Sequence, residues 1–295
     1  MKEAPAQLVI THGARVGELD VRRSLPTRRR RSVGAWCFAD HLGPVSLRPG
    51  ESADVAPHPH MGLQTVTWLF DGEFLHLDSL GSEQSIRPGQ LNLMSAGAGV
   101  AHAEEDPGQP RGRLHGIQLW VAQPEATRWG LAAFEHHESL PQSELGAGVA
   151  TVLIGSLGDA TSLARRDGDL VGAELRLQSG TSVLDAVATY EYGVIGIEGE
   201  VLVDDVVVEP GTMAYVAPGR DVLVLRARAS AIVMLVGGTP LSEPLVMWWN
   251  FVARSRDEIV AAYRSWSSHD ERFARVASRF APIEVAPPAW LARET

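Results

Sequence analysis

The sequence predicts an all-β protein made of two tandem antiparallel β-barrels followed by a short C-terminal helix. Short runs of β-branched and aromatic residues alternate with turn signals about every eight to twelve residues, which is typical of barrels and sandwiches. The order of turns also recurs, because Gly72 and Pro88 in the first half correspond to Gly199 and Pro210 in the second. Residues 255–266 differ, since their apolar side chains follow helical spacing.

The first half begins as an antiparallel meander. Residues 65–70 are rich in β-branched and aromatic side chains, and the Asp71-Gly72 pair after them is a strong hairpin-turn signal. Residues 73–78 start the return strand, and residues 114–121 form the next clear strand. Residues 125–148 then lose the β periodicity, so we expect the chain to cross between the two domains there.

Two domains are therefore expected, an N-terminal barrel at residues 1–135 and a C-terminal barrel at residues 136–295. Strands of the second barrel are predicted at residues 148–155, 172–177, 182–187, 192–197, 200–203, 213–216, 221–226 and 231–237. No histidine occurs between His137 and His269, so the second barrel is expected to lack metal ligands. Ser255, with Glu258 three residues later, is a plausible N-cap for the terminal helix.

The composition limits the class of function. A chain of 295 residues with 45% hydrophobic content can bury large cores, and a net charge of -10 argues against general nucleic-acid binding. We find no apolar run long enough for a signal peptide or a membrane span, so a cytoplasmic location is expected. The single cysteine, Cys37, fits a reducing compartment and is expected to be a small buried hydrophobe.

Two pairs of candidate metal ligands mark the first half. His58 and His60 are two residues apart, as are His102 and Glu104, so each pair shares one face of a β-strand. On neighbouring strands, the pairs would direct three imidazoles and a carboxylate to one point inside the barrel. Nitrogen and oxygen ligands without thiolate favour iron, manganese, copper, nickel or zinc, and four ligands leave two octahedral positions open.

The chain also resembles a known family. The stretches HPHMGLQTVTWLFDGEFLHLDSLG, RPGQLNLMSAGAGVAHAE and GGTPLSEPLVMWWNFVARSRDEI are similar to pirins, which are bicupins of the cupin superfamily. The resemblance implies two jelly-roll-like cupin barrels. It also implies that His58, His60, His102 and Glu104 bind a single divalent metal ion, most often Fe(II), in the N-terminal barrel. Manganese, copper, nickel and zinc are the alternatives.

Two positions depart from the usual pirin pattern. Gln64 stands where pirins usually have a glutamate, which would remove a carboxylate near the metal ligands. Trp249-Asn250 stands where pirins usually have Gly-Pro, so the shape of that loop is expected to differ.

Several other residues have weaker functional signals. His41 and His76 are expected to be structural or surface residues, whereas His115 and Gln118 are candidates for contact with a ligand or substrate. Residues 28–31 are four consecutive arginines, which we interpret as a solvated loop with a protein partner as the alternative.

The resemblance implies an oxidoreductase, a quercetin 2,3-dioxygenase (quercetinase) that opens a flavonol such as quercetin with dioxygen and releases carbon monoxide. Glu104 is the candidate catalytic base for the flavonol hydroxyl. A planar substrate is expected to lie against Leu63, Trp68 and Leu93.

Two alternatives to this activity stay open. One is a non-enzymatic regulatory protein in which the redox state of the iron alters the surface shown to a protein partner. The other is an isomerase or hydrolase with a divalent metal, because cupin barrels support many chemistries. Neither direct nucleic-acid binding nor membrane binding is expected.

Overall fold

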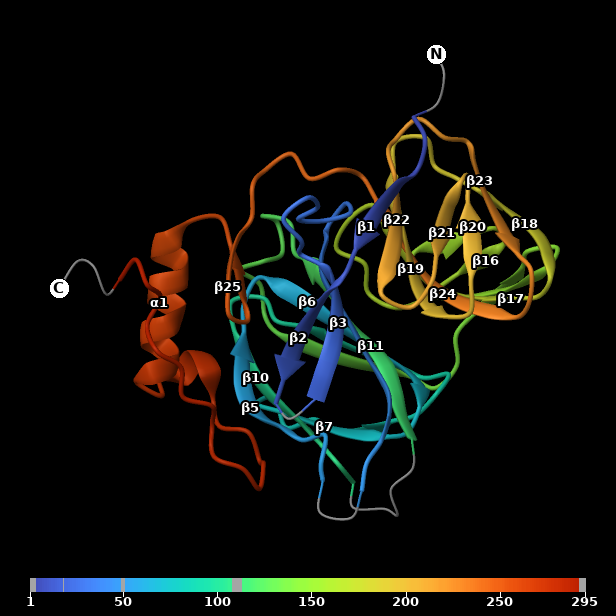
Figure 1. Cartoon of the computed structure of the whole chain (residues 1–295). Helices are drawn as coiled ribbons and strands as arrows, with labels where there is room; N and C mark the ends of the chain where they lie inside the picture. Colours follow the sequence, from blue (N-terminus) through green and yellow to red (C-terminus); the bar gives the residue numbers. More distant parts are fainter. Residues whose placement is uncertain (1–3, 18, 49–50, 108–112, 292–295) are drawn as a thin grey trace.

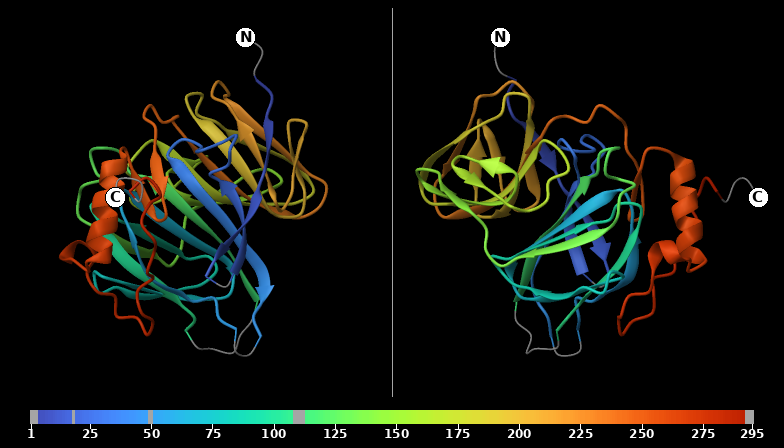
Figure 2. Two further views of the ribbon diagram at one scale, coloured as in Figure 1. Left: turned by 60° about the vertical axis from the view of Figure 1, so that its left-hand side comes forward. Right: turned by 180° about the vertical axis from the view of Figure 1, so that it is seen from behind.

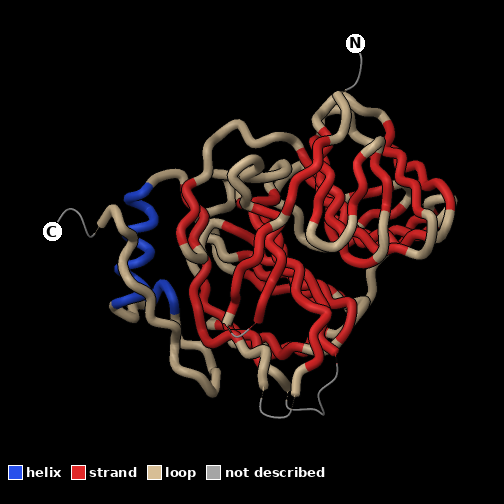
Figure 3. Tube along the Cα trace, viewed as in Figure 1, coloured by secondary structure: helices blue, strands red, loops and turns tan. Residues whose placement is uncertain are grey.

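The computed structural model describes residues 4–17, 19–48, 51–107 and 113–291. Two β-barrels lie side by side, and the C-terminal helix covers the side of the first barrel that faces away from the second (Figures 1 and 2). Almost all regular structure is strand (Figure 3). Among the described residues, no helix has the length and apolar character needed to cross a membrane.

The first barrel combines a seven-stranded and a four-stranded antiparallel sheet. The larger sheet contains, in spatial order, β12 (Ala133–His137), β9 (Leu91–Ser95), β6 (Leu63–Asp71), β11 (Arg113–Ala122), β4 (Trp36–Ser46), β3 (Leu19–Leu25) and β2 (His12–Val16). The smaller sheet contains β5 (Val55–His60), β10 (Val100–Glu105), β7 (Phe74–Asp78) and β8 (Glu83–Ile86). The turn predicted at Gly72 joins β6 to β7, and its φ of +90° is a conformation that favours glycine.

The second barrel repeats this arrangement. Its larger sheet contains, in spatial order, β1 (Gln7–Ile10), β22 (Thr212–Val216), β19 (Glu191–Glu198), β24 (Ala231–Gly238), β17 (Leu170–Leu177), β14 (Gly148–Ile154) and β13 (Gln142–Glu144). Its smaller sheet contains β18 (Gly180–Asp185), β23 (Val222–Ala227), β20 (Val201–Val203) and β21 (Val206–Val208). The hairpin of β15 (Ser156–Leu157) and β16 (Ala160–Thr161) leads from β14 toward β17.

Each end of the chain packs against the barrel that is remote in sequence. β1 pairs with β22 of the second barrel. The hairpin of β25 (Val246–Trp248) and β26 (Phe251–Ala253) lies against the first barrel, where Phe251 forms a bridge with Met61. The expected boundary between residues 135 and 136 falls inside β12 and stays a prediction.

The helix predicted at residues 255–266 is α1 (Arg256–Ser267), and a short 3₁₀ helix at Glu271–Phe273 follows it. The Ser255 side chain accepts a hydrogen bond from the backbone N–H of Glu258, which caps the first turn as expected. The buried residues Ile259 and Trp266 pack with Phe251 and Met61. The helix therefore closes the outer side of the four-stranded sheet of the first barrel.

One of the hydrophobic clusters spans both barrels. Trp36 from the first barrel is fully buried, and its indole N–H lies 3.1 Å from the carbonyl oxygens of both Val171 and Gly237 in the second. The Trp68 indole donates a hydrogen bond of 2.8 Å to Glu174 of the second barrel. Because these contacts join the larger sheet of one barrel to that of the other, we expect the barrels to depend on each other for stability.

Cys37 is fully buried and free, as expected of a small core residue. Burial raises the pKa of its thiol to about 12, so the thiol stays protonated and unreactive at neutral pH.

Candidate metal centre

Three histidines converge on one point in the first barrel. His58 and His60 lie on β5 and His102 lies on the neighbouring β10, with His102 directly opposite His58. One ring nitrogen of each histidine lies within 4.8 Å of those of the other two. The period-two alternation of a strand thus places His58 and His60 on the same side, as the sequence predicts.

The spacing of these nitrogens fits a shared metal ion. The Nε2 atoms of His60 and His102 lie 3.0 Å apart. Two nitrogens bound at about 2.1 Å to one ion, at a right angle, are separated by about 3.0 Å. The Nδ1 atom of His58 lies 2.8 Å from the carbonyl oxygen of Ala56. Since a carbonyl can only accept, Nδ1 carries the proton and the Nε2 lone pair is left for a metal.

The local electrostatics keep all three imidazoles neutral. Burial lowers the pKa of His58 to about 4 and lowers the pKa values of His60 and His102 well below their ordinary value. The neighbouring imidazoles lower the latter two further, because a second positive charge in the cluster would repel the first. Neutral imidazole is the form that binds metal ions, so the site is prepared for a cation at neutral pH.

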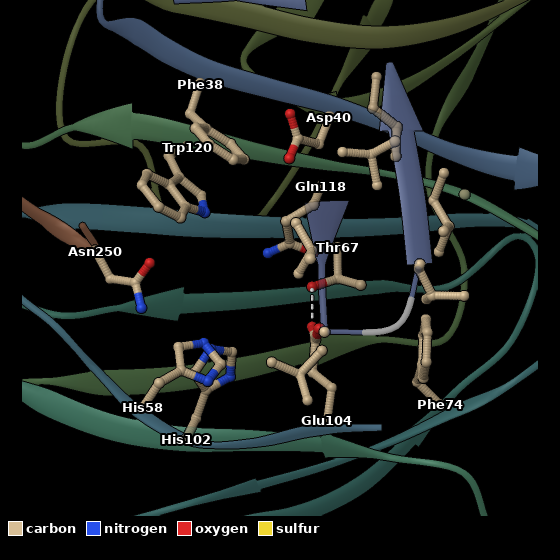
Figure 4. Close-up of a pocket in the computed structure, with 18 of the residues that line it drawn as sticks. Phe38, Asp40, His58, Thr67, Phe74, His102, Glu104, Gln118, Trp120 and Asn250 are labelled. Carbon is tan, nitrogen blue, oxygen red and sulfur yellow. Dashed lines mark hydrogen bonds between the residues drawn. The ribbon is translucent and has the colours of Figure 1, made fainter. Parts of the chain in front are cut away.

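Glu104 lines the same pocket but is not one of the three groups that meet within 4.8 Å. A β-bulge separates it from His102, so that Glu104 pairs with Val55 instead of continuing the register. The Thr67 hydroxyl lies 3.4 Å from a Glu104 carboxylate oxygen and donates to it (Figure 4). Desolvation raises the pKa of Glu104. Its role as a fourth ligand stays a prediction.

The histidines open onto a cavity of about 470 Å³. Phe38 and Trp120 form an aromatic wall, with ring centroids 3.9 Å apart and planes inclined by 12°. This wall lies across the pocket from His58 and His102 in the view of Figure 4. Polar side chains at the same cavity include Thr67, Glu104, Gln118 and Asn250, together with the ion pair of Arg23 and Asp40. The cavity therefore combines aromatic side chains with polar and charged groups, and the three histidines lie at one side of it.

The wall differs from the one expected from the sequence. Leu63, Trp68 and Leu93 are buried core residues and do not line the cavity. Strand alternation explains the error for Trp68, because Thr67 and Leu69 of β6 face the cavity and Trp68 points to the opposite face, toward the second barrel.

The two departures from the usual pirin pattern have different consequences. Gln64 does not line the cavity and donates a hydrogen bond of 2.8 Å to the Ser95 hydroxyl. Trp249 and Asn250, in contrast, both line the cavity, and Trp249 adopts a positive φ of 51°. The second departure therefore alters the pocket itself.

Of the weaker candidates, Gln118 lines the cavity and His115 does not. His115 instead contacts His41, with the two Nε2 atoms 2.8 Å apart. The Nδ1 atom of His115 lies 3.4 Å from a carboxylate oxygen of Glu198, which belongs to the second barrel. In the arginine run, Arg30 lies over the ring of Tyr215 in the second barrel, 3.4 Å from its centroid. At least this arginine is packed against the protein and not free in solvent.

The buried His41 predicts a loss of stability in acid. Burial, and secondarily the charge of Arg22, lower the pKa of His41 from 6.5 to about 3. The unfolded chain therefore binds a proton below pH 6.5 that the folded chain does not, and stability falls as the pH decreases. At about pH 5, His41 alone should cost roughly 2 kcal/mol.

Urea unfolding at neutral pH and at about pH 5 tests this expectation with His41→Gln, which removes the titrating group. The variant should lose less stability between the two pH values than the unaltered chain. An identical loss in both proteins would contradict the assignment.

Comparison with known proteins agrees with the fold. Residues 18–121 match the family model for pirin, and residues 172–273 match the model for the pirin C-terminal cupin domain. A protein of Pseudomonas aeruginosa named as a putative quercetin 2,3-dioxygenase is 42% identical over 96% of this chain and 90% of its own length.

Solved structures show the same architecture. The crystal structure of a quercetin 2,3-dioxygenase from Acinetobacter baumannii is 36% identical, with a TM-score of 0.93 and coverage of 96% of both chains. A bacterial pirin from Escherichia coli, solved in complex with nickel(II), shares the fold at 19% identity and a TM-score of 0.66, over 80% of this chain and all of that one. These matches confirm the predicted two-domain cupin fold with one C-terminal helix. The chain belongs to the pirin family.

Proposed function

We propose that this protein is a metal-dependent dioxygenase that cleaves a flavonol such as quercetin. The observation that carries the proposal is the set of three buried, neutral histidines at the side of a cavity with an aromatic wall. A volume of about 470 Å³ lies in the range of small-molecule sites, which is about 300–1,000 Å³. The 42% identical relative and the 36% identical structure carry the same activity in their names.

The metal would be held by His58, His60 and His102, with Glu104 as the fourth ligand. Fe(II) is the metal we propose, and the nickel complex of the E. coli pirin makes nickel the first alternative to test. When bound, such an ion acts as a Lewis acid that lowers the pKa of a hydroxyl group beside it.

The protein side chains would then bind and deprotonate the substrate. Phe38 and Trp120 both line the cavity and give it aromatic surface against which a planar aromatic ring can pack. Glu104 would accept the proton of the flavonol 3-hydroxyl. Its raised pKa suits this role, because a base works best when its pKa approaches the working pH. The Thr67 hydrogen bond would hold the carboxylate in place.

Oxygen consumption by anaerobically iron-loaded protein with quercetin tests the proposal, with carbon monoxide measured in parallel. We expect both signals in the unaltered protein and neither in a His58→Ala, Glu104→Ala double variant. If protein with stoichiometric iron, manganese, copper or nickel gives no turnover, the flavonol reaction is excluded. The chain would then be better described as a metal-dependent binding protein.

A further inference from the structure

A fourth histidine lies beside the candidate metal ligand His102, on the neighbouring strand. It is His76 on β7, the strand that pairs with β10 on the side away from β5. The Nδ1 atoms of His76 and His102 lie 3.3 Å apart. The other ring nitrogen of His76, Nε2, lies 3.2 Å from a carboxylate oxygen of Asp78. Asp78, His76 and His102 therefore form a continuous chain of contacts that ends at the metal side of His102.

We propose that His76 and Asp78 are positioning residues that fix the tautomer and the ring orientation of the metal ligand His102. This inference rests on the metal site of the proposed function, but it does not depend on which substrate is used.

The order of donors and acceptors along this chain is determined by its outer end. One oxygen of Asp78 accepts hydrogen bonds of 2.9 Å from the backbone N–H groups of Leu80 and Ser82. The other oxygen faces Nε2 of His76, and a carboxylate that accepts all three bonds requires this nitrogen to carry a proton. When the His76 ring carries this one proton, its Nδ1 atom is an acceptor, so Nδ1 of His102 is the donor.

The consequence falls on the metal side of His102. With its proton on Nδ1, the ring has its lone pair on Nε2, which is the atom that lies 3.0 Å from Nε2 of His60. The relay thus selects the tautomer that the metal needs. A hydrogen bond that ends on a carboxylate also makes the imidazole a stronger ligand.

His76 is held in place for this role and is not itself placed to bind the ion. Its ring stacks on Phe134 of β12, with centroids 4.3 Å apart and planes inclined by 14°. His76 and Asp78 are 4% and 3% exposed, so little water can compete for their hydrogen bonds. Among the described residues, the group that could hold a metal contains His58, His60 and His102 but not His76.

Cobalt(II) provides a test that does not depend on turnover, because its visible absorption reports the ligand geometry. Asp78→Asn keeps an acceptor for the backbone N–H groups but presents an NH₂ group to His76, which reverses the donor order. His76→Phe keeps the stacking surface and removes the acceptor. We expect each variant to bind Co(II) about 10–100-fold more weakly in competition with a chromogenic chelator, with altered absorption bands.

Two matched variants separate positioning from folding. His76→Asn places an amide oxygen near the former Nδ1 position and should bind Co(II) more tightly than His76→Phe. His41→Gln changes a buried histidine elsewhere in the first barrel and should leave affinity and spectrum unaltered. Thermal unfolding of the metal-free proteins identifies variants that fail to fold.

Unchanged Co(II) affinity and spectrum in folded Asp78→Asn would overturn the relay. Failure of the unaltered chain to bind Co(II) would overturn it together with the metal site. Weakened binding in the variants supports the relay even if quercetin is not a substrate.

Discussion

His60→Ala is expected to reduce bound metal from about one equivalent per chain to near zero and to abolish oxygenase activity. Loss of a partner behind a ligand typically costs about 10–100-fold in affinity or activity, and loss of a ligand should cost more. His60 is 1% exposed. Its Nε2 atom lies 3.0 Å from that of His102, and both atoms face the proposed metal position. Elemental analysis of iron-reconstituted protein, alongside oxygen consumption, measures both effects.

Glu104→Gln is the informative partner of this variant. If Glu104 is a ligand, metal content and activity should both fall. If Glu104 acts only as a base, metal content should be retained while activity falls. His136→Ala, which alters a histidine on β12 outside the cluster, is the control. Full metal occupancy in a folded His60→Ala protein would contradict the three-histidine centre.

The sequence predicts the local elements well where the pattern is local. The strand expected at residues 231–237 is β24 (Ala231–Gly238), and the helix expected at 255–266 is α1 (Arg256–Ser267). The convergence of His58, His60 and His102 follows from the period of a strand alone, once the two strands are neighbours. These features need only residue order and turn chemistry.

The features that the sequence does not reveal depend on contacts between distant segments. Nothing near β1 indicates that it pairs with β22, more than 200 residues later. The aromatic wall is another example, because Phe38 and Trp120 come from strands far apart in sequence. The error over Trp68 arose because alternation gives two faces but does not say which face meets the cavity.

The sequence contains a signal for the proposed contact of Asp78 and His76 with His102. His76 and Asp78 are two residues apart, so they share a face of their strand, just as the metal ligands do. Only the pairing of β7 with β10 shows that this face meets His102. A histidine with a carboxylate two residues later, on a strand next to a metal-binding strand, is therefore worth examining as a supporting pair.

Trp36→Ala is expected to destabilise the protein by about 3–5 kcal/mol, the usual cost of removing a buried tryptophan. The Trp36 ring enters the second barrel, and its indole N–H lies 3.1 Å from the carbonyl oxygens of Val171 and Gly237. The substitution would leave a cavity between the barrels and remove a buried donor. Urea unfolding followed by circular dichroism measures the loss, with Trp129→Ala as the control because Trp129 is 45% exposed.

The opposite change tests the same contact from the other side. A Cβ atom at Gly172 would lie 2.7 Å from Cζ2 of Trp36, so Gly172→Ala should overpack the interface and cost about 1–3 kcal/mol. Combining it with Trp36→Ala should cost less than the sum of the two, because the added methyl group then has space. Strict additivity would contradict a direct contact between Trp36 and Gly172. A loss of stability in Trp36→Ala no larger than that in Trp129→Ala would contradict a role for this ring in joining the barrels. Partial recovery in the double variant would show that the tryptophan and the glycine form one complementary contact.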